Sequence, residues 1–205
     1  MKNLLISFFS FLFINSICSA QTSVLPRLIK DSVKIIQPTK LRSSPMLVAF
    51  FKTDDTYIKI VYGSPLKKDR KIFGDLVPYG KLWRTGANEA TEITFTKDIK
   101  ISGKSLKAGT YTIFTIPNAN SWTVLINNDL GQWGDYQYKP ENDILSFEIP
   151  VEKTPKEIYE AFIIKFEDLD EGANMVMRWD DIKIAVPISI GSNASASSKS
   201  KKKNK

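Results

Sequence analysis

The feature that most constrains the fold is a succession of short β-patterned segments separated by turn residues, with no long helical pattern between them. The segments run to roughly six to ten residues and are rich in β-branched and aromatic side chains, several of them alternating in polarity. They lie at 46–52, 56–62, 91–96, 99–101, 110–116, 121–127, 143–151, 159–167, 174–179 and 182–188. Such strands pair antiparallel across turns, so the sequence predicts an all-β fold: a single antiparallel β-sandwich or jelly-roll-like domain.

One long interruption breaks this pattern, over residues 63–90. Glycines and prolines are frequent there, at Gly63, Pro65, Gly74, Pro78, Gly80 and Gly86. Glycine permits positive φ angles and proline fixes φ, so this stretch predicts a shaped, irregular loop. Its large aromatic side chains and its arginines need either burial or a partner. The loop is therefore where we expect a functional site, if the domain has one.

The N-terminus has the pattern of a secretory signal peptide. Lys2 precedes an apolar run over residues 4–14, and small residues lead up to an expected cleavage between Ala20 and Gln21. The apolar run is shorter than the ~20 residues that cross a bilayer. No second long apolar run follows. We therefore expect an exported protein, periplasmic or extracellular, with no transmembrane anchor.

Cysteine and histidine are nearly absent, and this excludes several kinds of chemistry. Cys18 is the only cysteine, and the chain has no histidine. Lipidation of Cys18 is the less favoured alternative to cleavage, because Ile17 stands where a small residue is expected. Cleavage leaves a mature chain without disulfides, thiol nucleophiles or iron–sulfur clusters. Lack of histidine removes Ser-His-Asp catalysis and the commonest zinc sites. We expect no cofactor, and the balance leans against an enzyme.

The sequence divides into a signal peptide (1–20), a leader (21–44), a β-sandwich domain (45–188) and a disordered basic tail (189–205). The formal net charge of +7 comes mostly from the ends. Lys2 and five tail lysines account for six of the 29 basic residues, which leaves 23 against 22 acidic residues. A body near +1 does not predict nucleic-acid binding. The tail either keeps the protein soluble or contacts an anionic envelope surface.

Several short sequence words occur in one order along most of the chain. They are Tyr62–Pro65 (YGSP), 70–74 (RKIFG), 76–80 (LVPYG), 83–91 (WRTGANEAT), 108–111 (AGTY), 114–117 (FTIP) and 132–134 (QWG). Together they resemble the DUF2911 family of exported proteins, common in bacteria of the Bacteroidetes type. The resemblance covers roughly residues 44–188. It implies an exported β-rich domain without an assigned activity, and it supplies no catalytic residues.

A non-catalytic binding module is the first functional hypothesis. The stretch from Tyr62 to Thr91 would carry the site, with Trp133 joining it. Arg84 would offer paired hydrogen-bond donors, Trp83 and Tyr79 would offer stacking surfaces, and Asn88 would give directional bonds. The ligand would be an envelope glycan, a small molecule or another envelope protein. The candidate ligand-binding residues are Tyr62, Arg70, Tyr79, Trp83, Arg84, Asn88, Glu89 and Trp133.

Two other hypotheses use the same loop. A glycan hydrolase would use Glu89 with a second acid, for which Asp75 and Asp135 are conceivable although no spacing selects them. A purely structural loop would instead be pinned to the sandwich by a buried Arg84–Glu89 ion pair, with Asn88 bonding backbone in a turn. Of these two explanations for Glu89, the ion pair is favoured.

Aromatic and acidic residues in loops leave two further alternatives. The aromatic residues Tyr79, Trp83, Trp133, Tyr136 and Tyr138 form either a stacking platform or plugs for the open ends of the sandwich, and plugging is favoured. The stretch 167–174 contains oxygen donors for calcium, with Asp168, Asp170 and Asn174 as weak candidates, and 127–129 forms a second cluster. Neither matches an EF-hand, and both fit ordinary turn chemistry, so we expect no metal.

Overall fold

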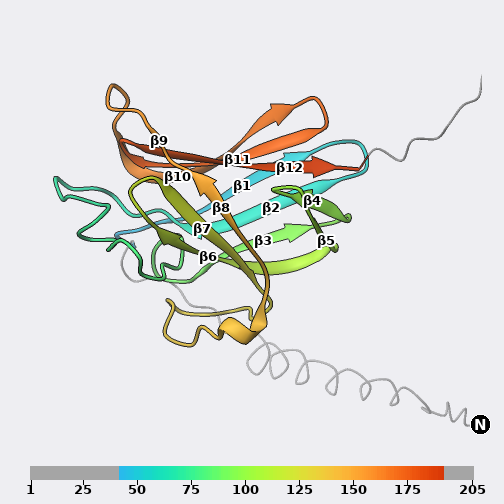
Figure 1. Cartoon of the computed structure of the whole chain (residues 1–205), viewed down its shortest axis with the longest axis horizontal. Helices are drawn as coiled ribbons and strands as arrows, with labels where there is room; N and C mark the ends of the chain where they lie inside the picture. Colours follow the sequence, from blue (N-terminus) through green and yellow to red (C-terminus); the bar gives the residue numbers. More distant parts are fainter. Residues whose placement is uncertain (1–41, 192–205) are drawn as a thin grey trace, which may run out of the picture. The chain divides into compact units, whose positions relative to one another are not determined.

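A computed structural model describes residues 42–191, in which nearly all regular structure is β-strand (Figure 1). The Ala20–Gln21 cleavage site, the leader before residue 42 and the tail beyond residue 191 lie outside the described residues. Between residues 42 and 191, no helix is long and apolar enough to cross a lipid bilayer. Helical structure in the described range consists of a single 3₁₀ turn, Pro140–Asn142.

The first of two antiparallel sheets has six strands in the order β1-β2-β3-β6-β7-β8. Their bounds are β1 Met46–Lys52, β2 Tyr57–Gly63, β3 Thr91–Phe95, β6 Gly109–Pro117, β7 Ser121–Asn127 and β8 Asp143–Pro150. Most neighbours in this sheet are also neighbours in sequence, and short turns join β1 to β2 and β6 to β7. The long loop interrupts this meander between β2 and β3, so both of its ends are fixed by adjacent, paired strands.

The second sheet follows the path β10-β11-β12-β4-β5, with β9 pairing to β12. Its strands are β4 Ile99–Ile101, β5 Lys104–Leu106, β9 Glu152–Lys153, β10 Tyr159–Leu169, β11 Gly172–Asp180 and β12 Ile182–Ile190. Figure 1 shows this sheet stacked over the first. Two facing antiparallel sheets confirm the predicted all-β sandwich. The short strands β5 and β9 were not predicted, because too few residues alternate in either of them.

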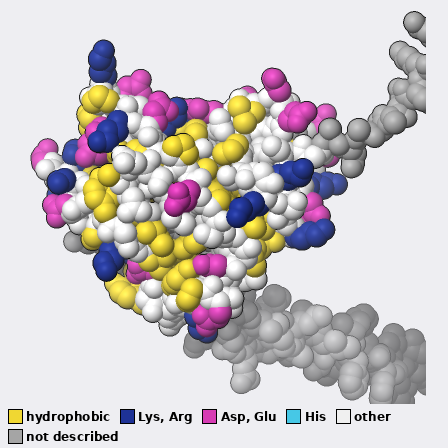
Figure 2. All heavy atoms as spheres, in the orientation of Figure 1, with side chains coloured by type: hydrophobic (Ala, Val, Ile, Leu, Met, Phe, Trp, Pro, Cys, Tyr) yellow, Lys and Arg dark blue, Asp and Glu magenta, His cyan; other side chains and the backbone are white. Residues whose placement is uncertain are grey.

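The core lies between the two sheets, and it follows from the period-two alternation of side chains. In β2, Ile58, Ile60 and Tyr62 are buried while the residues between them are partly exposed. In the opposite sheet Met175, Met177 and Trp179 are buried. Charged side chains of both signs are interspersed over the face in Figure 2, as expected for a domain with nearly balanced charges.

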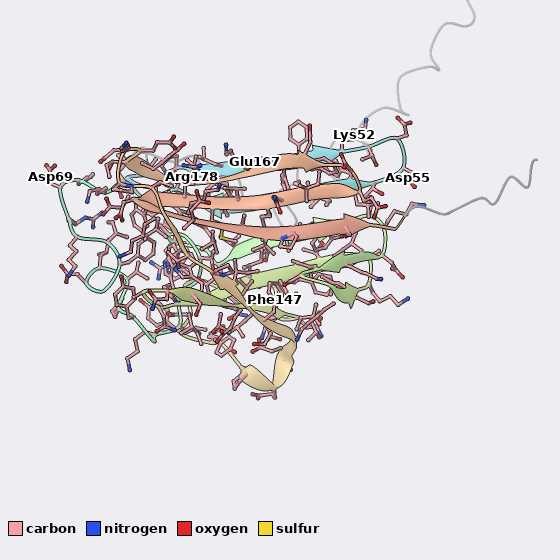
Figure 3. The ribbon with its side chains drawn as sticks, turned by 45° about the horizontal axis from the view of Figure 1, so that its top comes forward. Lys52, Asp55, Asp69, Phe147, Glu167 and Arg178 are labelled. Atoms are coloured by element: carbon pink, nitrogen blue, oxygen red, sulfur yellow. The ribbon has the colours of Figure 1, made fainter. Side chains whose placement is uncertain are left out.

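The loop between β2 and β3 closes one end of the sandwich. Figure 3 shows Asp69, within this loop, at the opposite end of the molecule from Asp55 in the β1–β2 turn. The loop is not a loose excursion, because Phe73 and Trp83 insert into the main core cluster. Isolated bridges also tie the loop to strands, including Leu66 to Ala161 of β10. The predicted irregular loop is thus an ordered part of the fold, and any site on it rests on a rigid base.

Candidate functional site

Trp83 anchors the loop to the core. Its side chain is 7% exposed, and its ring stacks on that of Trp179 with centroids 6.0 Å apart and planes 19° apart. The ring of Phe162 lies edge-on at 5.1 Å. The indole Nε1–H donates to the carbonyl oxygen of Gly86 at 3.0 Å. Trp83 therefore plugs the end of the sandwich, as the favoured explanation for the loop aromatics expected, and little of its surface is left for a ligand.

A close backbone approach fixes the next residues against β2. The amide of Ala87 donates to the carbonyl of Gly63 at 3.2 Å. A Cβ atom on Gly63 would stand 1.9 Å from the carbonyl oxygen of Ala87, far inside van der Waals contact. Only glycine permits this approach, since it lacks the Cβ. The end of β2 thereby sets the position of the segment from Trp83 to Asn88.

A cavity of about 340 Å³ opens between this segment, the first half of the loop and the residues just before β1. This volume is at the lower end of the ~300–1,000 Å³ typical of small-molecule sites. The lining residues are Ser43, Ser44, Pro65, Leu66, Lys68, Arg70, Leu76, Val77, Trp83, Arg84, Gly86, Ala87, Asn88 and Trp179. Three of them are basic and none is acidic. We refer to this space as the arginine cavity.

Arg84 lines the arginine cavity without a counter-ion among residues 42–191. Its side chain is half-buried, and its Nε atom is buried with no hydrogen-bond acceptor among the described residues. The expected Arg84–Glu89 ion pair is wrong, because Glu89 binds Nη1 of Arg42 at 2.7 and 2.8 Å. Thr85 and Asn88 have φ angles of 57° and 64°. These turns separate the two side chains, so that Arg84 and Glu89 line different cavities.

Arg70 is held rigidly on the other wall of the cavity. Its Nε donates to the carbonyl of Lys67 at 2.9 Å, and its Nη2 donates to the carbonyl of Leu66. Lys67 is itself fixed, because its ammonium group pairs with Asp180 at 2.7 Å. Asn88 was expected to bond backbone within its own turn, but its side-chain amide donates instead to the carbonyl of Ser44, before β1, at 3.3 Å. Arg70 is thus oriented by the loop itself, and Asn88 by the segment before β1.

The remaining sequence candidates lie elsewhere. Tyr62 is buried, and its hydroxyl accepts from the amide of Ile164 at 3.0 Å and donates to the carbonyl of the same residue. Burial raises the pKa of Tyr62, and the bonds to Ile164 partly offset that rise. Tyr79 and Trp133 are exposed, and neither lines the arginine cavity. Of the eight predicted candidates, the cavity brings together Arg70, Trp83, Arg84 and Asn88.

Sequence reasoning missed Lys68, Trp179 and the two serines before β1. The alternation of β11 places Trp179 on the inward face, but no local signal joins it to a loop far away in sequence. Ser43 and Ser44 fell within the predicted leader, where the pattern is weak. Lys68 has a φ angle of 50°. Such strain in a non-glycine residue cannot be read from the sequence, yet it is a recognised mark of functional loops.

The aromatic residues in the loop after β7 divide between the two interpretations, plugs of the sandwich and a stacking platform. Tyr138 is half-buried, and its ring lies edge-on to Phe114 with centroids 5.0 Å apart. Burial, and then its hydrogen bond to the Asp143 carboxylate, raise the pKa of Tyr138. Trp133 and Tyr136 are instead 59% and 83% exposed. Tyr136 borders an open hollow on this side of the domain. Tyr138 therefore fits the interpretation as a plug, while the side chains of Trp133 and Tyr136 remain at the surface.

The weak calcium candidates occupy a hairpin. Asp168 and Asp170 are exposed around the β10–β11 turn, and Asn174 lies opposite Glu167 in the ladder. Throughout residues 42–191, no group of three or more His, Cys, Asp or Glu side chains is arranged to hold a metal. In the second cluster, Asn127 donates to the Asp143 carboxylate at 2.8 Å and to the carbonyl of Lys139 at 3.1 Å. Those bonds order the loop after β7.

Comparison with known proteins adds one finding. The model of the family described as "Protein of unknown function (DUF2911)" matches residues 44–188, well over half of the chain. No curated protein and no solved structure matches the sequence. The matched range begins at Ser44, which lines the arginine cavity, and it includes every residue of that cavity except Ser43.

Proposed function

We propose that this chain, which belongs to the DUF2911 family, is a non-catalytic ligand-binding domain of the bacterial cell envelope, with the arginine cavity as its site. The proposal rests on Arg84, whose side chain is half-buried and has no counter-ion among residues 42–191. A half-buried guanidinium without a counter-ion destabilises a fold unless something compensates its charge. A ligand in the cavity supplies that compensation.

Export supports a role in the envelope. The expected signal peptide would deliver the domain across the inner membrane. There the ligand would be an envelope glycan, a small molecule or a segment of an envelope protein. The volume of the cavity, about 340 Å³, favours a small molecule or the end of a longer chain over an extended polymer.

A glycan hydrolase remains the second candidate, and one observation bears on it. Glu89 and Glu92 line the same cavity, of about 210 Å³, on the other side of the loop. However, Glu89 is bound by Arg42, and Glu92 accepts a bond from the amide of Gly131 at 2.7 Å. The space is also smaller than most ligand sites. Full retention of any glycan-cleaving activity in Glu89→Gln would eliminate this candidate.

The hypothesis that the loop is purely structural explains Trp83 but not Arg84. Trp83 has the contacts of a brace, since it packs on Phe162 and Trp179 inside the core. Arg84, the next residue, lacks the ion pair with Glu89 that a brace would use. A loop that is anchored by one residue and presents the next to a cavity is the arrangement expected of a rigid binding site.

The experiment that tests the proposal is ligand-induced stabilisation of the mature chain, residues 21–205. Envelope glycans, small metabolites and calcium are screened by thermal unfolding, with Arg84→Ala in parallel. A ligand that binds only the folded state raises Tm by mass action. We expect at least one compound to raise Tm in the wild type and not in a folded Arg84→Ala protein. If none does, or if every shift survives in the variant, the cavity is not a binding site.

A further inference from the structure

We infer that the arginine cavity recognises an organic oxyanion: a carboxylate or phosphate group at Arg84, attached to an apolar body that lies against Leu66 and Leu76 of the lining. This inference rests on the proposed function and names the class of ligand. Four properties of the cavity lead to it, namely its charge, the desolvation of Arg84, its apolar wall and its rigidity.

The charge of the lining is one-sided. Lys68, Arg70 and Arg84 line the cavity, and no Asp or Glu is among its described lining residues. As a whole, residues 42–191 nearly balance their charges, with 19 basic and 21 acidic residues. A concave site with cations alone concentrates positive potential and attracts anions.

A comparison of Arg84 with Arg178, the other arginine with a buried and unpaired Nε among residues 42–191, shows how unusual the charge of Arg84 is. Both have a buried Nε without an acceptor in the described part of the chain. Arg178 nevertheless has its charge compensated, because Nη1 pairs with Glu157 at 2.7 Å and the guanidinium lies over the Tyr159 ring. Arg84 has no such pair among residues 42–191. The fork of N–H donors on arginine fits the oxygens of a carboxylate or phosphate, so an oxyanion is the missing partner.

The lining of the same cavity also has an apolar part. Its side chains are Pro65, Leu66, Leu76, Val77, Trp83 and Trp179. Leu66 is half-buried and Leu76 is 43% exposed, while the other four are buried. An inorganic anion would satisfy Arg84 but leave these two leucines in water, and a neutral apolar molecule would cover them and leave Arg84 unpaired. A molecule with an anionic and an apolar part satisfies both, because burial of its apolar part is itself favourable.

The cationic wall is also held in position before any ligand arrives. Arg70 is fixed by backbone carbonyls, and Lys68, Thr85 and Asn88 have φ angles of 50°, 57° and 64°. Left-handed backbone is unfavourable for a β-branched residue such as Thr85, and such strain tends to gather at ligand clamps. A site ordered in advance loses less entropy on binding.

Four probes separate the two halves of the expected ligand. The compounds are 3-phenylpropionate, 3-phenylpropionamide, phenyl phosphate and inorganic phosphate. Binding to the mature chain is followed by amide chemical shifts, which locate the site, and by titration calorimetry. The variants are Arg84→Met and Lys68→Gln, with Lys81→Gln as the matched control. Lys81 is an exposed cation of the same loop that does not line the cavity.

We expect 3-phenylpropionate or phenyl phosphate to shift cavity residues and to bind at least tenfold more tightly than both the amide and inorganic phosphate. Which of the two binds more tightly identifies the head group. Arg84→Met should weaken binding at least tenfold and Lys68→Gln severalfold, while Lys81→Gln leaves it unchanged. If Arg84→Met does not fold, Lys68→Gln and the ratio of anion to amide still decide the matter.

Other outcomes overturn the inference in distinguishable ways. Equal binding of the amide, or unchanged binding in both cavity variants, excludes an oxyanion as the recognised group. If the cavity binds a neutral compound from the thermal screen and none of the anions, the ligand class is wrong but the binding site stands. If no probe and no screened compound shifts a cavity residue, both the inference and the proposed function fail.

Discussion

The carboxylate of Glu89 accepts two hydrogen bonds from Nη1 of Arg42, at 2.8 and 2.7 Å. This pair joins the residues before β1 to the loop that closes the end of the sandwich. Ser44 is held on the same side, because its carbonyl accepts a bond from Asn88. The pair thereby keeps Ser43 and Ser44 at the rim of the arginine cavity, and it removes Glu89 from the surroundings of Arg84.

Breaking this pair should loosen the rim without unfolding the domain. The two side chains are 45% and 34% exposed, and ion pairs at such positions contribute about 0–1 kcal/mol. We expect Glu89→Gln to lower the free energy of unfolding by less than ~1 kcal/mol. Hydrogen exchange should increase at residues 42–45. Asp98→Asn, which breaks the exposed Asp98–Lys107 pair away from the cavity, should leave that exchange unchanged. A much larger loss of stability would make Glu89 a structural brace.

Replacing Arg84 by a neutral side chain of similar length should leave the ligand-free protein as stable as before, or more stable. Arg84 has no counter-ion among residues 42–191, so removing its partly desolvated charge removes an unfavourable interaction, and hydrophobic replacements of buried charges are often neutral or stabilising. We therefore expect the urea midpoint of Arg84→Met to equal or exceed that of the wild type. Arg178, whose guanidinium pairs with Glu157 and lies over the Tyr159 ring, is the matched control.

Arg178→Met should behave in the opposite way. It removes the ion pair with Glu157 and the contact with the Tyr159 ring, and hydrogen bonds to charged groups contribute ~1.5–3 kcal/mol. Its urea midpoint should therefore fall clearly below that of the wild type. If the urea midpoint of Arg84→Met falls as far as that of Arg178→Met, Arg84 has a stabilising partner, and an anionic ligand is no longer needed to compensate its charge.

Adding one methyl group at Gly63 should damage both stability and binding. The new Cβ would stand 1.9 Å from the carbonyl oxygen of Ala87, a backbone atom that cannot rotate away. Overpacking of this kind costs ~1–3 kcal/mol or more. We expect a lower Tm for Gly63→Ala and weaker binding of any cavity ligand, because the segment carrying Arg84 must shift. Gly103→Ala is the control, since a Cβ there meets no atom within 4 Å although its φ is positive. Binding should survive that change.

The strands could be predicted because their signal is local. Residues 46–52 and 121–127 were predicted as strands and form β1 and β7 with the same bounds. Alternation of side chains along one strand carries all the information needed. The fold class then follows from strand length and turn spacing. The short strands β5 and β9 carry too little alternation to be recognised, whereas Ile99 and Ile101 of β4 continued the pattern of the preceding strand.

The site was predicted only where its residues are neighbours in sequence. Arg70, Trp83, Arg84 and Asn88 were all identified from one loop, and they do line one cavity. The ion-pair partner of Glu89 was predicted wrongly. Arg84 lies near Glu89 in sequence, but the turns at Thr85 and Asn88 direct the two side chains apart. Arg42 and Trp179 come from distant segments, and only the assembled sheets bring them to the loop.

The buried hydroxyl of Tyr62 should make stability fall at alkaline pH. Burial raises the pKa of Tyr62 above its ordinary value of 10.0, so the folded protein keeps this proton where the unfolded chain loses it. Its contribution is therefore fully present below about pH 10, and it is lost as the pH rises through the folded-state pKa. Tyr62→Phe removes this titration together with the bonds to Ile164, which leaves the amide of Ile164 without its acceptor. At pH 8 we expect the variant to be less stable by ~1–3 kcal/mol.

That difference should shrink as the pH rises above about 10, because only the wild type loses the contribution of Tyr62. Urea unfolding at pH 8 and at pH 11 measures it directly. Tyr111 and Tyr138, whose pKa values burial also raises, titrate in both proteins, so the stability of the variant itself should still decline with pH. Tyr57→Phe, which alters a half-exposed tyrosine of the same strand, is the control and should follow the wild-type curve. A difference between wild type and Tyr62→Phe that stays constant from pH 8 to pH 11 would show that Tyr62 does not keep its proton through burial in the folded state.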